Sequence, residues 1–156
     1  LIATPHVRIG MVTRNVTIDP EQTLRRLFAR HAIDIDAFDH FACIPLRGDK
    51  TASFRDARVR LGINPARCYA CGDEFSDYLA AIGAGMYPLI VAYGAEDRSR
   101  LRQTHGVPED FIHASPTEFR EKLLHTLALE DLLPPIGLEM ETHPDPAPGD
   151  AVGRGA

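Results

Sequence analysis

Short apolar runs alternate with amphipathic stretches along most of the chain, and this alternation is the strongest constraint on its fold. Strand-like runs are predicted at residues 7–12, 38–44, 68–71, 87–92 and 110–113. Helices are predicted at residues 21–31, 52–61, 75–84, 95–104 and 117–129. Strands that alternate with helices through short connections form parallel sheets covered by helices on both faces. We therefore expect an α/β fold, a Rossmann-like three-layer arrangement around one parallel sheet.

The composition of the C-terminal end sets the expected domain boundary. Residues 134–156 hold five of the twelve prolines and four of the twelve glycines of the chain. Such a segment buries too little apolar surface to offset the entropy lost on ordering. We expect one domain over residues 1–133, followed by a Pro/Gly-rich tail or linker over residues 134–156.

Composition also argues against several classes of protein. Acidic residues outnumber Lys and Arg by 22 to 17, and this net charge of −5 argues against a general nucleic-acid-binding surface. The longest strongly apolar stretch, residues 86–93, is far shorter than the roughly 20 residues of a membrane-spanning helix. Three cysteines cannot all pair, which favours a reducing, cytoplasmic location. Cys68 and Cys71 have redox or zinc spacing, but residues i and i+3 of a strand face opposite sides, so we expect both in the core.

Polar residues gather where the predicted strands end, which is where open parallel sheets bind ligands. These residues are Thr13, Arg14 and Asn15 after the first strand, Lys50 before the second helix, and Asp73 and Asp77 after the third strand. A hydroxyl, an ammonium and a pair of carboxylates suit a phosphate held beside a divalent cation, because Mg²⁺ prefers oxygen ligands.

The order of these residues resembles that of the haloacid dehalogenase superfamily of phosphohydrolases. The run Gly10–Asn15 is similar to the second motif of that family, a strand that ends in Thr or Ser. Lys50, ahead of a helix that ends in Leu61-Gly62-Ile63, resembles the lysine of its third motif, although the usual Lys-Pro pair is here Lys50-Thr51. The run Cys71–Asp77 is similar to its fourth motif, GDxxxD. The resemblance covers about residues 7–94.

The resemblance implies a role for each residue at the strand ends. Thr13 would hydrogen-bond a phosphoryl oxygen, and Lys50 would balance the charge of the phosphate and of the nucleophile. Asp73 would ligate Mg²⁺, with Asp77 as a second ligand or a partner behind it. The implied phosphate-binding residues are Thr13, Arg14, Asn15 and Lys50, and the implied catalytic residues are Thr13 and Lys50. We also expect Lys50 to face solvent and to contribute little to packing.

The first motif of the family, Asp-x-Asp on a strand that precedes all of these residues, has no counterpart here. No aspartate precedes Asp19, and the chain begins with Leu1, so we expect it to be cut at its N-terminus. In the family that strand lies between the strands represented by residues 7–12 and 68–71, and its loss would leave two rows of backbone groups unpaired. We expect an upstream segment or another chain to complete the sheet, or the two flanking strands to close on each other.

Two functions stay open at this point. The complete polypeptide would be a Mg²⁺-dependent hydrolase of phosphate monoesters, acting on a phosphorylated small molecule or protein. Alternatively, the domain is a non-catalytic phosphate- or protein-binding module of a larger assembly. The presence or absence of Asp-x-Asp upstream of Leu1 distinguishes them, because without a nucleophile this chain should have no covalent phosphatase chemistry. A response-regulator-like domain would need an acidic cluster on the first strand, and the sequence shows none.

Overall fold

The computed structural model describes residues 1–14 and 17–132, so Asn15 and the tail predicted at residues 134–156 lie outside the described residues. The alternation predicted from the sequence is confirmed. The strands are β1 (Gly10–Arg14), β2 (His40–Ile44), β3 (Tyr69–Gly72), β4 (Tyr87–Val91) and β5 (Ile112–His113). The α-helices are α1 (Pro20–Ala29), α2 (Lys50–Leu61), α3 (Phe75–Ala84) and α4 (Pro116–Thr126). Short helical turns lie at Ile35–Ala37, Pro65–Arg67, Arg100–Thr104, Glu109–Phe111 and Glu130–Leu132.

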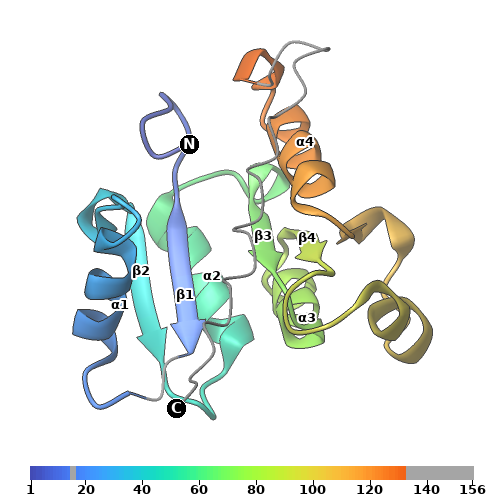
Figure 1. Cartoon of the computed structure of the whole chain (residues 1–156), viewed down its shortest axis with the longest axis horizontal. Helices are drawn as coiled ribbons and strands as arrows, with labels where there is room; N and C mark the ends of the chain where they lie inside the picture. The colour runs from blue at the N-terminus through green and yellow to red at the C-terminus, as the bar shows by residue number, and fades with distance from the viewer. Residues whose placement is uncertain (15–16, 133–156) are drawn as a thin grey trace, which may run out of the picture.

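All the strand pairs are parallel, but the described strands form two sheets rather than one (Figure 1). One sheet pairs β1 with β2, and the other has the order β3-β4-β5. The two flanking strands β1 and β3 do not pair with each other within the described part of the chain. The expectation that they close on each other is therefore wrong.

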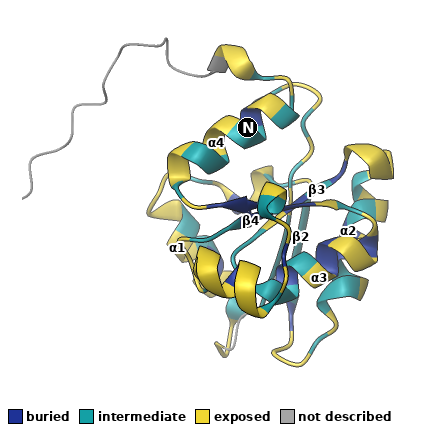
Figure 2. Cartoon of the chain, turned by 90° about the vertical axis from the view of Figure 1, so that its right-hand side faces the viewer, coloured by how far each residue is buried: buried dark blue, intermediate teal, exposed yellow. Residues whose placement is uncertain are grey.

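Helices cover both faces of the larger sheet, as the α/β class requires. Figure 2 shows α4 on one side of β3 and β4, and α2 and α3 on the other side. The helix α2 contacts β1, β2 and α3, so it connects the two sheets. A cluster of small and apolar side chains fills this connection. Its members are Val12 of β1, Phe54 of α2, Ala70 of β3, Met86, and Ala80, Ala81 and Ala84 of α3.

Local sequence signals explain where α2 and α3 begin and end. The carboxylate of Asp49 accepts the N–H groups of Thr51 and Ala52, which caps the start of α2. Gly62 ends α2 with a φ of 65°, a left-handed conformation that favours glycine. At the C-terminus of α3, Arg55 and Arg58 of α2 donate to the last carbonyl groups, where positive charge is favourable.

Two predicted elements differ from those observed. The first strand begins at Gly10 rather than residue 7, because the N–H of Ile9 donates to the carboxylate of Asp39 instead of to a strand. The helix predicted at residues 95–104 is wrong at residues 95–97. There the N–H of Ala95 donates to Asp73, and Tyr93 pairs with Asp97 in an antiparallel bridge. The chain is helical from Arg98 onward, and Arg100–Thr104 is π-type.

None of the helices within residues 1–14 and 17–132 combines the length and apolar character needed to cross a membrane.

Candidate functional site

Thr13 and Arg14, two of the predicted phosphate-binding residues, are expected from the sequence in the loop after the first strand. The structure places them in the strand itself, as the last two residues of β1. Thr13 and Arg14 are half-buried and pair in register with Cys43 and Ile44 of β2. The Thr13 hydroxyl makes only a 3.5 Å contact with the carbonyl of Arg14. The Arg14 guanidinium reaches the carbonyl of Gly48 at 3.5 Å, and its buried Nε has no partner among the described residues. Arg14 therefore has an unused donor at the end of β1.

Lys50 is half-buried with a largely covered side chain, which corrects the expectation that it faces solvent. It is the first residue of α2, and its side chain is only 12% exposed. Its ammonium forms an ion pair with Asp77 of α3 and lies 3.7 Å from the carboxylate of Glu74. A positive charge at the N-terminus of a helix is unfavourable by itself. The two carboxylates offset that cost and link α2 to α3.

The carboxylate of Asp77 is fully engaged within the protein. One of its oxygens accepts the N–H groups of Asp73 and Glu74 at 3.2 and 3.1 Å, and the other faces Lys50. The side chain is 7% exposed. It packs so closely on Gly72 that a Cβ at that position would clash with it. Asp77 therefore orients both Lys50 and the backbone that carries Asp73.

Asp73 is the carboxylate best placed to hold a cation. It directly follows β3, and its Oδ2 accepts the N–H of Ala95 at 2.9 Å. Its Oδ1 has no hydrogen-bond partner within the described ranges. A Cβ on Gly94 would clash with the Asp73 side chain, so the glycine makes room for this carboxylate beside the loop that follows β4.

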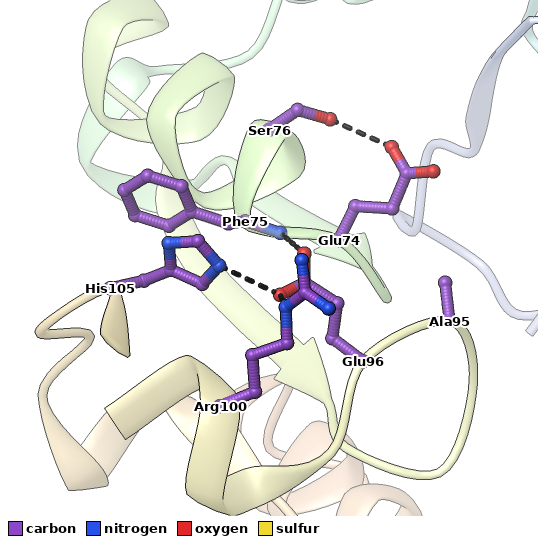
Figure 3. A pocket seen from close by; sticks show the side chains of 7 residues that line it. All are labelled: Glu74, Phe75, Ser76, Ala95, Glu96, Arg100 and His105. Atoms are coloured by element: carbon purple, nitrogen blue, oxygen red, sulfur yellow. Dashed lines mark hydrogen bonds and ion pairs between the residues drawn. The ribbon is translucent and has the colours of Figure 1, made fainter. Parts of the chain in front are cut away.

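A second acidic residue, Glu96, connects the same two loops. Its carboxylate accepts the N–H of Phe75 at 2.7 Å and also contacts Arg100 and His105 (Figure 3). The residues that line the adjoining cavity of about 390 Å³ are Glu74, Phe75, Ser76, Ala95, Glu96, Arg100 and His105. The sequence places Glu96 after the fourth strand, but no local signal gives it a role, because its partners lie in other loops.

The three cysteines are free, and they differ in solvent exposure, with Cys43 half-buried. Cys68 is buried as expected, whereas Cys71 is exposed, so the prediction of a core position is wrong for Cys71. Cys71 lines a cavity of about 500 Å³ together with Asp73, Tyr93 and Phe119. Although the side chain is accessible, surrounding protein atoms desolvate the thiol and raise the pKa of Cys71 to about 11. The thiol is therefore neutral at pH 7.

These contacts bring the ends of four strands together at one edge. Arg14 links the end of β1 to the loop before α2, Lys50 links α2 to the start of α3, and Asp73 links the end of β3 to the loop after β4. In the part of the chain that the structure describes, no three His, Cys, Asp or Glu side chains converge tightly enough to hold a metal ion. A cation bound to Asp73 would need further ligands from water or from another segment.

Comparison with known proteins agrees with this architecture. Residues 49–118 match the model of the HAD-hydrolase-like family, a range that holds Lys50, Asp73 and Asp77 but not Thr13 or Arg14. No curated protein and no solved structure gives a significant match. The match over residues 49–118, together with the parallel α/β architecture, supports membership of the HAD-like hydrolase superfamily.

Proposed function

We propose that this chain supplies the phosphate-binding and metal-binding groups of a Mg²⁺-dependent phosphate-monoester hydrolase. The nucleophilic aspartate is carried by a strand that lies between β1 and β3. The observation that carries the proposal is the pair of free strand edges. Among the described residues, β1 pairs only with β2 and β3 pairs only with β4, while Arg14 and Asp73 at their carboxyl ends contact the loops before α2 and after β4.

The helix layer that β1 and β3 share could cover one further parallel strand between them. Val12 of β1 and Ala70 of β3 contact the same core cluster as Phe54 of α2, so one helix layer covers both edges. Unpaired N–H and C=O groups along a strand favour pairing with an added strand. A parallel strand in this place would bring its carboxyl end beside Arg14, Lys50 and Asp73. We propose that the strand comes from an upstream segment or from another chain.

Phosphoryl transfer relies on positioning and on neutralising charge, and the site residues offer both. Arg14 has a buried Nε without a partner in the described residues, and Thr13 has a hydroxyl with only one long contact. Both can donate to phosphoryl oxygens. Lys50, held by Asp77, places a positive charge where the phosphate and the nucleophile would meet. Asn15 follows Arg14 directly and is proposed as a further phosphate ligand.

Among the described site residues, the one available carboxylate, that of Asp73, suits Mg²⁺, a hard cation that prefers carboxylate oxygens and completes its shell with several waters. Asp73 offers a carboxylate oxygen without a protein partner among the described residues, and Gly94 leaves room for that side chain. Mg²⁺ would neutralise developing charge on the transferred phosphoryl group. Asp77 is proposed to act through Lys50 and the Asp73 backbone, because both of its oxygens are already engaged.

The free cysteines favour a reducing compartment, and we propose a cytoplasmic location for the protein.

The test compares this chain with a polypeptide that also carries the sequence upstream of Leu1, using p-nitrophenyl phosphate and Mg²⁺. We expect no turnover by the chain alone, because its groups position and neutralise but do not attack. We expect turnover by the longer polypeptide. In it, Asp73→Asn should weaken Mg²⁺ binding and lower turnover together, and Asp39→Asn is the matched control before the start of β2.

Turnover by the chain alone at a rate unaffected by Asp73→Asn would contradict the proposal. An upstream segment without Asp-x-Asp would favour the other function, a non-catalytic module that binds phosphate or protein at the same edge. In that case Asp73 and Asp77 act as capping residues of α3.

A further inference from the structure

Two reciprocal hydrogen bonds join the loop that carries Asp73 to the loop after β4. Asp73, at the start of the first loop, accepts the N–H of Ala95 in the second at 2.9 Å. Glu96, in the second loop, accepts the N–H of Phe75 in the first at 2.7 Å (Figure 3). Each loop therefore supplies one carboxylate and one backbone donor, and the two bonds fix the loops against each other.

Glu96 is itself held by side chains from the turn that follows it. Its Oε2 lies 3.3 Å from Nε of Arg100 and 3.0 Å from Nε2 of His105, and the side chain is only 14% exposed. The imidazole of His105 also stacks on the ring of Phe75, with centroids 4.3 Å apart and an interplanar angle of 10°. His105 therefore lies against both residues of the Glu96–Phe75 bond, by ring stacking on Phe75 and by close approach to Glu96, although its Nε2 and the Oε2 of Glu96 make no well-aligned hydrogen bond among the described residues.

We propose that Glu96 is a positioning residue that holds Asp73 in the orientation needed to bind Mg²⁺, an inference that rests on the proposed function for the role of Asp73. Phe75 is the first residue of α3, and the first N–H groups of a helix have no partner within the helix. Without Glu96 that N–H loses its acceptor, and the segment from Asp73 to Phe75 loses one of its two bonds to the neighbouring loop. Residues behind a metal ligand commonly set its orientation in this way.

The direct test is hydrogen exchange of the Ala95 amide, followed by NMR on the full chain without any ligand. In Glu96→Ala we expect the protection factor of the Ala95 amide, which bonds to Asp73 and not to Glu96, to fall about tenfold. The amide of Ile90 in β4 reports global opening, and its protection should change less than about twofold. Glu96→Gln keeps an oxygen that can accept from Phe75 and should restore most of the protection.

The matched control is Asp39→Ala. Asp39 also pairs with an arginine and accepts a backbone N–H, from Ile9 at 2.8 Å, but it does so at the start of the β1–β2 sheet. Its loss should leave the Ala95 amide unchanged. His105→Phe keeps a ring beside Phe75 and removes the contact with Glu96, so we expect an effect between those of Glu96→Gln and Glu96→Ala.

A second readout concerns Mg²⁺ binding, titrated by the chemical shift of the Asp73 amide. Glu96→Ala should weaken Mg²⁺ binding about tenfold, within the range found when the partner of a metal ligand is removed. Unchanged Ala95 protection, a loss equal to that of Ile90, or unchanged Mg²⁺ affinity would each overturn the inference. If the wild-type protein binds no Mg²⁺ even with the upstream segment present, the proposed function fails, whereas a selective loss at Ala95 still shows that Glu96 holds the loop.

Discussion

The two sheets differ sharply in how well they are buried. In β4 the residues Pro88, Leu89 and Ile90 are buried, and both residues of β5 are buried as well. No residue of β1 is fully buried, and Ile44 is the one buried residue of β2. The strand β4 has neighbours on both edges and helices on both faces, whereas β1 pairs on one edge only within the described part of the chain. The β3-β4-β5 sheet therefore has a complete core, and the β1–β2 sheet does not.

The residues of the proposed site are divided between the well-buried sheet and the less buried one. The proposed metal ligand Asp73 follows β3 in the well-buried sheet, and the proposed phosphate ligands Thr13 and Arg14 end β1 in the other sheet. The ion pair between Lys50 and Asp77 connects the two parts. We infer that the metal-binding side is preformed and that the phosphate-binding side gains rigidity when a further strand pairs with β1.

The largest predicted effect is on the free energy of unfolding. It compares the loss of stability when one isoleucine in each sheet is truncated to alanine. Ile90 is fully buried in a cluster with Leu101, Val107 and Ile112, so Ile90→Ala should lower the free energy of unfolding by about 4 kcal/mol. Ile44 is 9% exposed at the end of β2, and Ile44→Ala should cost about 2 kcal/mol. Urea denaturation of both variants measures the difference. Equal losses would mean that the β1–β2 sheet is as well packed as the other.

The second prediction concerns the ion pair that links the sheets. Removing one partner of a buried pair leaves an uncompensated charge, so Lys50→Met should cost about 2–4 kcal/mol, at or below the range for fully buried pairs. Asp77→Asn keeps an oxygen for the N–H groups of Asp73 and Glu74 and should cost less. The double variant should be more stable than the sum of the two losses predicts, because no charge is then left unpaired. Additive losses would show that the pair contributes no coupling.

Much of the fold could be predicted from the sequence because local signals define most elements. The helix α3 runs over Phe75–Ala84 as predicted, since Gly85 ends it in a left-handed conformation. The prediction failed at residues 95–97, where the amphipathic pattern indicates the start of a helix. The N–H of Ala95 instead bonds to Asp73, a residue distant in the sequence, and this tertiary contact overrides local propensity.

The candidate site residues could be named from the sequence, but their contacts could not. Resemblance to a family pointed to Lys50, Asp73 and Asp77, and the structure places all three at one edge. The burial of Lys50 could not be predicted, because it depends on the meeting of α2 with α3. The contacts of Glu96 likewise depend on Phe75 and His105, which come together only in the folded chain.

The smallest predicted effect is a difference in acid sensitivity between the two sheets. His113 of β5 is 4% exposed, and burial lowers the pKa of its imidazole below the ordinary 6.5, an effect that Lys122 adds to and Glu118 opposes. In the β1–β2 sheet, the N–H of Ile9 and then Arg8 hold the pKa of Asp39 below its ordinary 3.8.

The direction of each effect follows from which state binds the proton more readily. The unfolded chain protonates His113 near pH 6.5, whereas the folded chain resists protonation, so stability falls as the pH drops below about 6.5. Asp39 stabilises the fold above its unfolded pKa of about 3.8, and this contribution is lost only as the pH falls further, through the folded pKa. The urea midpoint should therefore be lower at pH 5.5 than at pH 7.5 in the wild type and in Asp39→Asn. In His113→Asn the difference between the two pH values should be smaller. If His113→Asn shows the same decrease as the wild type, another group accounts for the acid sensitivity, and the buried face of β5 is not its source.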